Sequence, residues 1–295
     1  MKSNDRGDRR RQAMVILSMG SVMISFSSIF VKLAQVGPIA SGFYRVFFGA
    51  LFLLPFALAT GKRPSFKPLL PATICGLIFA IDLTVWHKSI HGVGPGLATV
   101  LGNLQVFVLT LFGILVFKEK SNKWTWISVG LAITGLLLLV GPGWHRVTPE
   151  WKWGLLFGLM TALVYSTYIL SLRRLQSDQG EESQIWNMLM VSATCAGFMA
   201  LEIAFTPEVF AIPDNKSLCA LVALGFLGQG LGWYLISRSL PLLDVSVSGL
   251  IILIQPALSF AWDILFFSRP TTLLDIAGAS LVLTAIYLGT RAKKL

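Results

Sequence analysis

The chain has 295 residues, of which 55% are hydrophobic and only 13% are charged. A soluble domain carries roughly 25% charged residues, and a chain of this length folded in water would expose more surface than so few charges could cover. The composition therefore excludes a soluble globular protein, a disordered chain and a nucleic-acid-binding protein, and it predicts an integral membrane protein with several spans. The formal net charge of +10 is then expected to report which side of the membrane each loop faces.

Ten apolar stretches are long enough to cross a membrane, for which a helix needs about 20 residues. In chain order they cover residues 13–34, 38–59, 69–90, 93–117, 124–141, 153–172, 184–206, 217–239, 244–265 and 271–290. The connections between them are short, so none is predicted to form a domain outside the membrane. The sequence predicts an all-α integral membrane protein with ten transmembrane helices.

The positive residues of the connections predict the orientation of these helices. If the N-terminus is cytoplasmic, the inner segments hold almost three times as many Lys and Arg residues as the outer segments. This bias predicts that both termini are cytoplasmic, in basic tails over residues 1–12 and 291–295. Because the positive charge is dispersed over short loops, it does not indicate a nucleic-acid partner.

The two halves of the chain resemble each other. Asn103-Leu-Gln105-Val106 in one half corresponds to Leu253-Ile-Gln255-Pro256 in the other, and each Gln is followed fourteen residues later by a polar loop, at Glu119 and Arg269. Five spans therefore form one repeat, over residues 13–141 and again over 153–290, with a linker at 142–152. An odd number of spans makes the second copy enter from the opposite side, and such inverted repeats are typical of secondary transporters.

On these motifs the chain resembles the EamA-type transporters of the drug/metabolite transporter superfamily, which are ten-helix exporters. The resemblance rests on the two five-helix halves, Arg45 in the second span, Lys118-Glu119 after the fourth and Gln255-Pro256 in the ninth. It implies efflux of amino acids or other small metabolites across the bacterial inner membrane. The chain departs from the family pattern at Asn103 and Gln105, where a Pro is common, and at Ser268-Arg269, where a Gly-Glu pair is frequent.

Two ionisable side chains of opposite sign fall at similar depth in consecutive spans. Arg45 lies about seven residues, or roughly 10 Å, from the outer end of its span, and Asp82 lies at a similar distance from the outer end of the next. Charge at this depth is costly and often functional, which predicts a gate or a contact with a substrate carboxylate; a structural ion pair is the alternative. Trp86, one turn beyond Asp82, would line the outer mouth of a cavity or anchor the helix at the membrane interface.

Further polar side chains lie in the middle of spans of both halves: Asn103, Gln105, Tyr165, Tyr168, Gln229, Trp233 and Gln255. An amide without a partner in hydrocarbon costs several kcal/mol, so these groups must face other helices or water. As a set they predict a central cavity, in which Trp and Tyr would suit an apolar or aromatic metabolite. Pro256 removes a backbone hydrogen bond halfway along its span and is predicted to act as a hinge.

The sequence contains no motif that predicts a bound metal or cofactor. There is no Walker A sequence, and His87, His91 and His145 lack the further ligands of a zinc site. The favoured function is a secondary transporter, not an enzyme, with a small-molecule substrate and membrane lipid as partners and with a monomer as a compatible state. A membrane enzyme acting on a lipid-linked substrate, and an importer with the same fold, remain alternatives.

Overall fold

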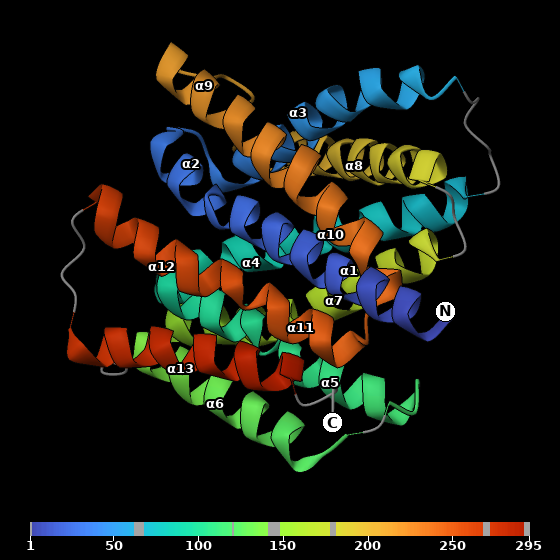
Figure 1. The fold of residues 1–295 in the computed structure, drawn as a ribbon. Coiled ribbons are helices and arrows are strands. Elements are labelled where there is room, and N and C mark those ends of the chain that lie inside the picture. Colours follow the sequence, from blue (N-terminus) through green and yellow to red (C-terminus); the bar gives the residue numbers. More distant parts are fainter. Residues whose placement is uncertain are drawn as a thin grey trace. The chain divides into compact units, whose positions relative to one another are not determined.

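The computed structural model describes residues 2–61, 68–119, 121–140, 148–177, 181–267 and 272–291. Within these ranges the regular structure is helical throughout and contains no strand (Figure 1). The elements are α1 (Lys2–Ser25), α2 (Ser27–Leu33), α3 (Pro38–Ala59), α4 (Leu69–Asn103), α5 (Gln105–Leu115), α6 (Lys123–Val140), α7 (Pro149–Gln176), α8 (Glu181–Ala204), α9 (Asn215–Ala223), the π-helix η2 (Leu224–Trp233), α10 (Tyr234–Ser239), the 3-10 helix η3 (Leu240–Leu242), α11 (Val245–Ile252), α12 (Ile254–Phe267) and α13 (Leu273–Arg291).

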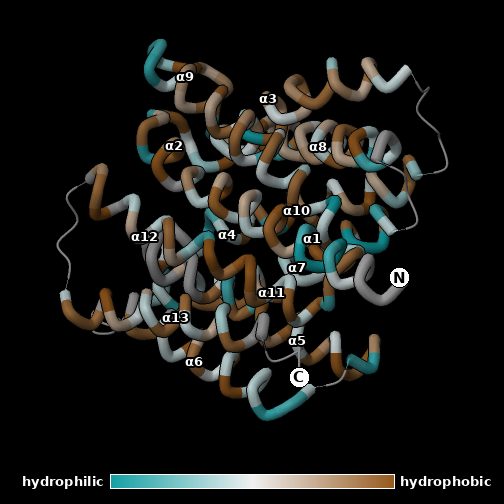
Figure 2. Tube along the Cα trace, viewed as in Figure 1, coloured by the Kyte–Doolittle hydropathy of each residue, from teal (hydrophilic) through white to brown (hydrophobic). Residues whose placement is uncertain are grey.

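Seven stretches of the described helices are long and apolar enough to cross a membrane: Gly7–Leu33, Pro38–Ala59, Leu69–Ser89, Pro149–Gln176, Ser183–Ala204, Asn215–Leu242 and Val245–Phe266. The expected spans 93–117 and 271–290 contain the shorter apolar helices Leu101–Leu115 and Ile276–Ala285, and the expected span 124–141 contains α6. Figure 2 shows apolar residues along most helices. Many large apolar side chains, such as Leu70 and Leu115, are exposed, as expected of helices solvated by lipid.

Several sequence features fall outside the described residues. They include His145, Ser268-Arg269, residues 142–147 of the expected linker and the chain beyond residue 291. The side chain of His91 also lies outside the described set.

The helices form two compact units, and each unit draws on both halves of the sequence. Unit 1 comprises Met1–Thr84 and Thr167–Leu242, and unit 2 comprises Val85–Ser166 and Leu243–Leu295. In unit 1, α3 packs on α8 and η2, and α1 packs on η2 and α10. In unit 2, α5 packs on α11, and α6 lies beside α13 (Figure 1). Three of these pairs, α3 with α8, α5 with α11 and α6 with α13, join helices at equivalent places in the two halves of the sequence.

Three apolar helical stretches are interrupted by a single residue, at Phe26, Leu104 and Leu253. Leu104 N–H donates to Leu101 O at 3.1 Å and Leu253 N–H to Leu250 O at 3.2 Å, so the chain tightens to three-residue bonds at both positions. Pro256 has no N–H to donate to the carbonyl of Ile252, the last residue of α11, which gives a physical reason for the interruption at Leu253. Pro256 remains a predicted hinge.

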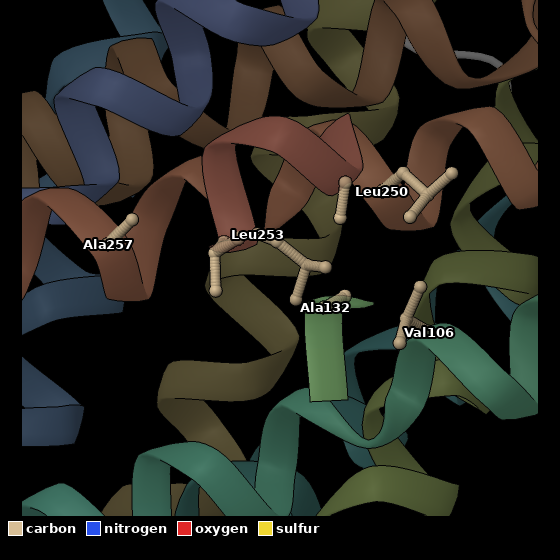
Figure 3. Packing of buried hydrophobic residues seen from close by; sticks show 7 residues of the cluster. Val106, Ala132, Leu250, Leu253 and Ala257 are labelled. Atoms are coloured by element: carbon tan, nitrogen blue, oxygen red, sulfur yellow. The ribbon is translucent and has the colours of Figure 1, made fainter. Parts of the chain in front are cut away.

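Small residues and branched apolar residues fill the core of unit 2. The cluster joins Val106, Ala132, Leu250, Leu253, Ala257, Val282 and Ala285, all at most 5% exposed (Figure 3). Gly135 of α6 lies so close to α13 that a Cβ atom placed on it would be 2.6 Å from Gly278 O and 2.9 Å from Val282 N. These are backbone atoms that cannot move aside, so the α6–α13 contact requires a glycine at position 135.

We predict that Gly135→Ala lowers the free energy of unfolding of the detergent-solubilised protein by about 1–3 kcal/mol, because the added methyl group forces α6 and α13 apart. Gly130→Ala is the matched control in the same helix, since a Cβ there would meet nothing within 4 Å. The control should leave stability unchanged or raise it by up to about 1 kcal/mol through better helix propensity. Thermal unfolding measures both; equal losses would contradict the packing argument.

Candidate functional site

A cation lies against a buried aromatic cluster in unit 1. The guanidinium carbon of Arg45, on α3, is 5.9 Å from the ring centre of Phe79 on α4. Phe79 stacks on Tyr168 of α7 with ring centres 4.3 Å apart, and Trp233 of η2 stands edge-on to the two rings at 5.5 and 4.8 Å. None of the three rings is more than 1% exposed. Cation–π attraction and edge-to-face packing both favour this arrangement.

Asp82 adds a buried carboxylate to the same unit. It follows Phe79 by three residues on α4, is 5% exposed and interacts electrostatically with Arg45. Cys195 of α8 lies within electrostatic range of both Arg45 and Asp82. Within the described chain, Asp82 Oδ1 accepts no hydrogen bond. A buried carboxylate oxygen that retains acceptor capacity is a candidate for a proton or for a ligand donor.

The π-helix η2 passes beside Arg45 and carries a buried amide side chain. A Cβ atom on Gly228 would lie 3.8 Å from Arg45 Nε, which places the backbone of η2 at Gly228 beside the Arg45 side chain. Gln229 is fully buried; its Nε2 donates to Ser192 Oγ at 2.9 Å, and its Oε1 has no hydrogen-bond partner among the described residues. π-Helical turns are rare and occur frequently at functional sites.

Glycines allow α3 to approach η2 this closely. A Cβ atom on Gly225 would lie 2.5 Å from Phe48 Cβ, one on Gly49 would lie 2.5 Å from Gln229 Cβ, and one on Gly230 would collide with the Phe52 ring. The sequence prediction missed this contact, and it also missed Phe79 and Ser192. The glycines at 225, 228, 230 and 232 were the available signal, since small residues at helix interfaces let membrane helices pack closely.

Unit 2 holds the other candidate residues, around the interruptions at Leu104 and Leu253. Gln105 is fully buried, and neither of its side-chain amide atoms has a partner in the described part of the chain. Gln255 Nε2 is likewise without a partner there. Asn103 and Tyr165 are half-buried. Amides that lack partners beside helix breaks are suited to bind a polar ligand.

Trp86 packs within unit 2. Its ring centre lies 5.1 Å from that of His87, and its Cδ1 atom lies 4.0 Å from the place of a Cβ on Gly102. Thr161 of α7 borders the same glycine. Trp86 is half-buried in these contacts, which is compatible with both roles predicted for it.

Unit 1 contains another acid that the sequence prediction did not single out. Thr84 Oγ1 donates to Glu202 Oε2 of α8 at 2.5 Å.

Over the residues described, His, Cys, Asp and Glu side chains form no group of three or more that could hold a metal ion.

These features define a helical, multi-pass membrane protein whose helices bury charged and amide groups. The sequence profile of the EamA-like transporter family matches residues 12–141 and again 152–291, so the chain belongs to this family. This membership argues against the alternative of a membrane enzyme that acts on a lipid-linked substrate.

Relatives of this chain are also named as transporters. An uncharacterized transporter of Archaeoglobus fulgidus is 23% identical over 96% of this chain and 97% of its own length. An S-adenosylmethionine uptake transporter of Rickettsia prowazekii is 21% identical over 66% of this chain and 63% of its own length. One solved crystal structure superposes with a TM-score of 0.81 at 18% identity, over 96% of this chain and 98% of the other, which shows a shared fold.

We predict that the ring of Tyr168, more than its hydroxyl group, holds the aromatic cluster together. Tyr168→Leu removes the stack on Phe79 and should lower the free energy of unfolding by about 2 kcal/mol. Tyr168→Phe retains the ring and should cost about 1 kcal/mol or less. Thermal unfolding of the two purified variants measures this difference. A larger loss in Tyr168→Phe than in Tyr168→Leu would overturn the prediction.

Proposed function

We propose that this protein is a secondary transporter that exports a small organic metabolite, an amino acid or a related compound, across the cell inner membrane by alternating access. The observation that carries the proposal is that the half-buried Arg45 and the buried Asp82 lie beside Phe79, Tyr168 and Trp233 in one unit. A lipid-solvated protein retains charges at such a place chiefly where they bind or move something.

The chemistry of this cluster suits a zwitterionic solute with an apolar or aromatic part. Arg45 would contact a substrate carboxylate, while Asp82 and Gln229 Oε1 would accept hydrogen bonds from an ammonium group. The aromatic rings would contact the remainder of the solute. The name of the Rickettsia relatives supports this class, because S-adenosylmethionine is an amino acid derivative with a positive charge and an aromatic base.

Ten spans in two inverted five-helix repeats would supply the alternating movement. The two matches of one family profile to residues 12–141 and 152–291 support this part of the proposal. So do the interruptions at Leu104 and Leu253, which lie within two residues of the corresponding Gln105 and Gln255. With both termini cytoplasmic, as the loop charges predict, α3 begins and α8 ends at the outer face, whereas α5 ends and α11 begins at the inner face.

Import is the second candidate. The relatives named for uptake of S-adenosylmethionine favour it, and an alternating-access carrier can run in either direction according to the gradients that drive it. A mass-spectrometric comparison of the growth medium of cells with and without the protein decides the direction. Export predicts a solute that accumulates in the medium of the expressing cells; faster depletion of a solute would establish import.

We predict that Asp82→Asn lowers flux of that solute at least tenfold in proteoliposomes, because the amide cannot carry the charge or the proton of the carboxylate. The level of the variant in the membrane should stay close to that of the parent protein. Glu150→Gln is the matched control, since Glu150 is exposed in the first turn of α7 and should leave flux unchanged. Unchanged flux in Asp82→Asn would contradict the proposal.

The double variant Arg45→Gln with Asp82→Asn distinguishes a functional pair from a structural ion pair. If the two charges only neutralise each other, removing both leaves no unpaired charge and should restore flux relative to either single variant. If they contact the solute, the double variant should be as inactive as Asp82→Asn. Flux in proteoliposomes of equal protein content is the measurement, and recovery to more than about half of the parent rate would establish the structural role.

A further inference from the structure

Glu208 caps a helix that lies far away in the sequence. It belongs to the segment between α8 and α9, and its carboxylate accepts from Ile39 N–H at 3.2 Å and Ala40 N–H at 2.9 Å, in the first turn of α3. The residue before α3 is Gly37, and a Cβ atom there would collide with the Glu208 carboxylate. The first N–H groups of a helix have no partner within the helix, so a carboxylate at this place binds both the N–H groups and the helix dipole.

Neighbouring contacts fasten the same segment to α3. Tyr44 O–H donates to Phe210 O, and the rings of Phe43 and Phe210 meet edge-on with centres 5.0 Å apart. These contacts and the Glu208 cap tie the end of α8 to the beginning of α3 within unit 1. We refer to the Glu208 contact with Ile39 and Ala40 as the Glu208 latch.

Glu119 makes the corresponding contact in unit 2. Its carboxylate accepts from Val245 N–H at 2.7 Å and from Ser246 O–H at 2.8 Å, at the beginning of α11. The turn that presents it is unusual: Lys118 has a φ of 52°, and Glu119 N–H donates to Gly113 O at 3.0 Å. A Cβ atom on Gly113 would lie 2.7 Å from the carboxylate, so this side chain also rests on a glycine. This contact is the Glu119 latch.

The two latches are related by the internal repeat. Glu119 follows the fourth predicted span and binds the beginning of the ninth, while Glu208 follows the seventh and binds the beginning of the second. Each latch thus joins the end of one span to the start of its counterpart, five spans away. In the proposed orientation the Glu208 latch lies at the outer face and the Glu119 latch at the inner face. Both carboxylates are only half-buried, so water can replace the N–H donors when a latch opens.

We infer that the Glu208 latch holds the outer face of the transporter closed and that the Glu119 latch holds the inner face closed. The two latches open in alternation during transport. This inference rests on the proposed function, because alternating access requires that one face opens only while the other is closed. Opening of the outer face separates Glu208 from α3, and opening of the inner face separates Glu119 from α11. Glu119 and Glu208 are positioning residues in this account and do not contact the solute.

Cross-linking one latch and observing the other tests the inference without a solute. In a Cys219→Ser background, since Cys219 is the exposed native thiol, Glu208→Cys and Ala40→Cys are joined by a short bifunctional methanethiosulfonate reagent in lipid nanodiscs. Residue-resolved hydrogen exchange then follows the Val245 and Ser246 amides of the other latch. The reciprocal experiment joins Glu119→Cys to Ser246→Cys and follows the Ile39 and Ala40 amides. The same variants reduced with dithiothreitol are the matched controls.

We predict that closing either latch covalently speeds amide exchange at the other by at least about threefold relative to the reduced control, because it shifts the population toward the state open at the opposite face. Unchanged exchange at the remote amides in both experiments would overturn the inference and leave Glu119 and Glu208 as static helix caps. Failure of the proposed function is a separate result, since it would appear as absence of solute flux in the parent protein.

Discussion

The hydrocarbon of a membrane offers no hydrogen bonds, and the rest of this structure follows from that constraint. Backbone groups must be satisfied within helices, and every buried polar side chain must find a partner in the protein or in a ligand. A charge is the most costly group to place there, and Asp82 is 5% exposed with the half-buried Arg45 close to it. Their mutual attraction, the face of the Phe79 ring and the polar groups of η2 are what the fold supplies in place of water.

Close helix packing is the second consequence of the same constraint. Because no water drives helices together in the hydrocarbon, membrane helices associate through van der Waals contact and through close approach of their backbones at small residues. Gly135 against α13 and the glycines of η2 against α3 show this in the two units. In unit 1 the close approach has a further effect, because it brings the backbone at Gly228 beside the Arg45 side chain and so joins packing to the candidate site.

Hydropathy predicted most of the membrane spans from sequence, and charged residues within apolar runs predicted part of the candidate site. Seven of the predicted spans coincide with candidate membrane helices, and Arg45 and Asp82 stood out because a charge in an apolar run is easily seen. Phe79 could not be predicted as part of the site, since an apolar ring in an apolar span gives no contrast. Glu119 was visible within a motif, but its role depends on a helix that begins 126 residues later, at Val245. The π-helix and the division into two units also depend on tertiary packing that no local pattern encodes.

The central claim is that a solute binds among buried polar groups and is carried by alternating exposure of its site. Counterflow in proteoliposomes tests this most directly, with the solute that changes in the medium of expressing cells supplied in radiolabelled form. Vesicles loaded with the unlabelled solute should take up the label faster than empty vesicles, and the initial rate should saturate with external concentration. A rate that is indifferent to loading and rises without saturation would contradict a carrier and indicate a channel.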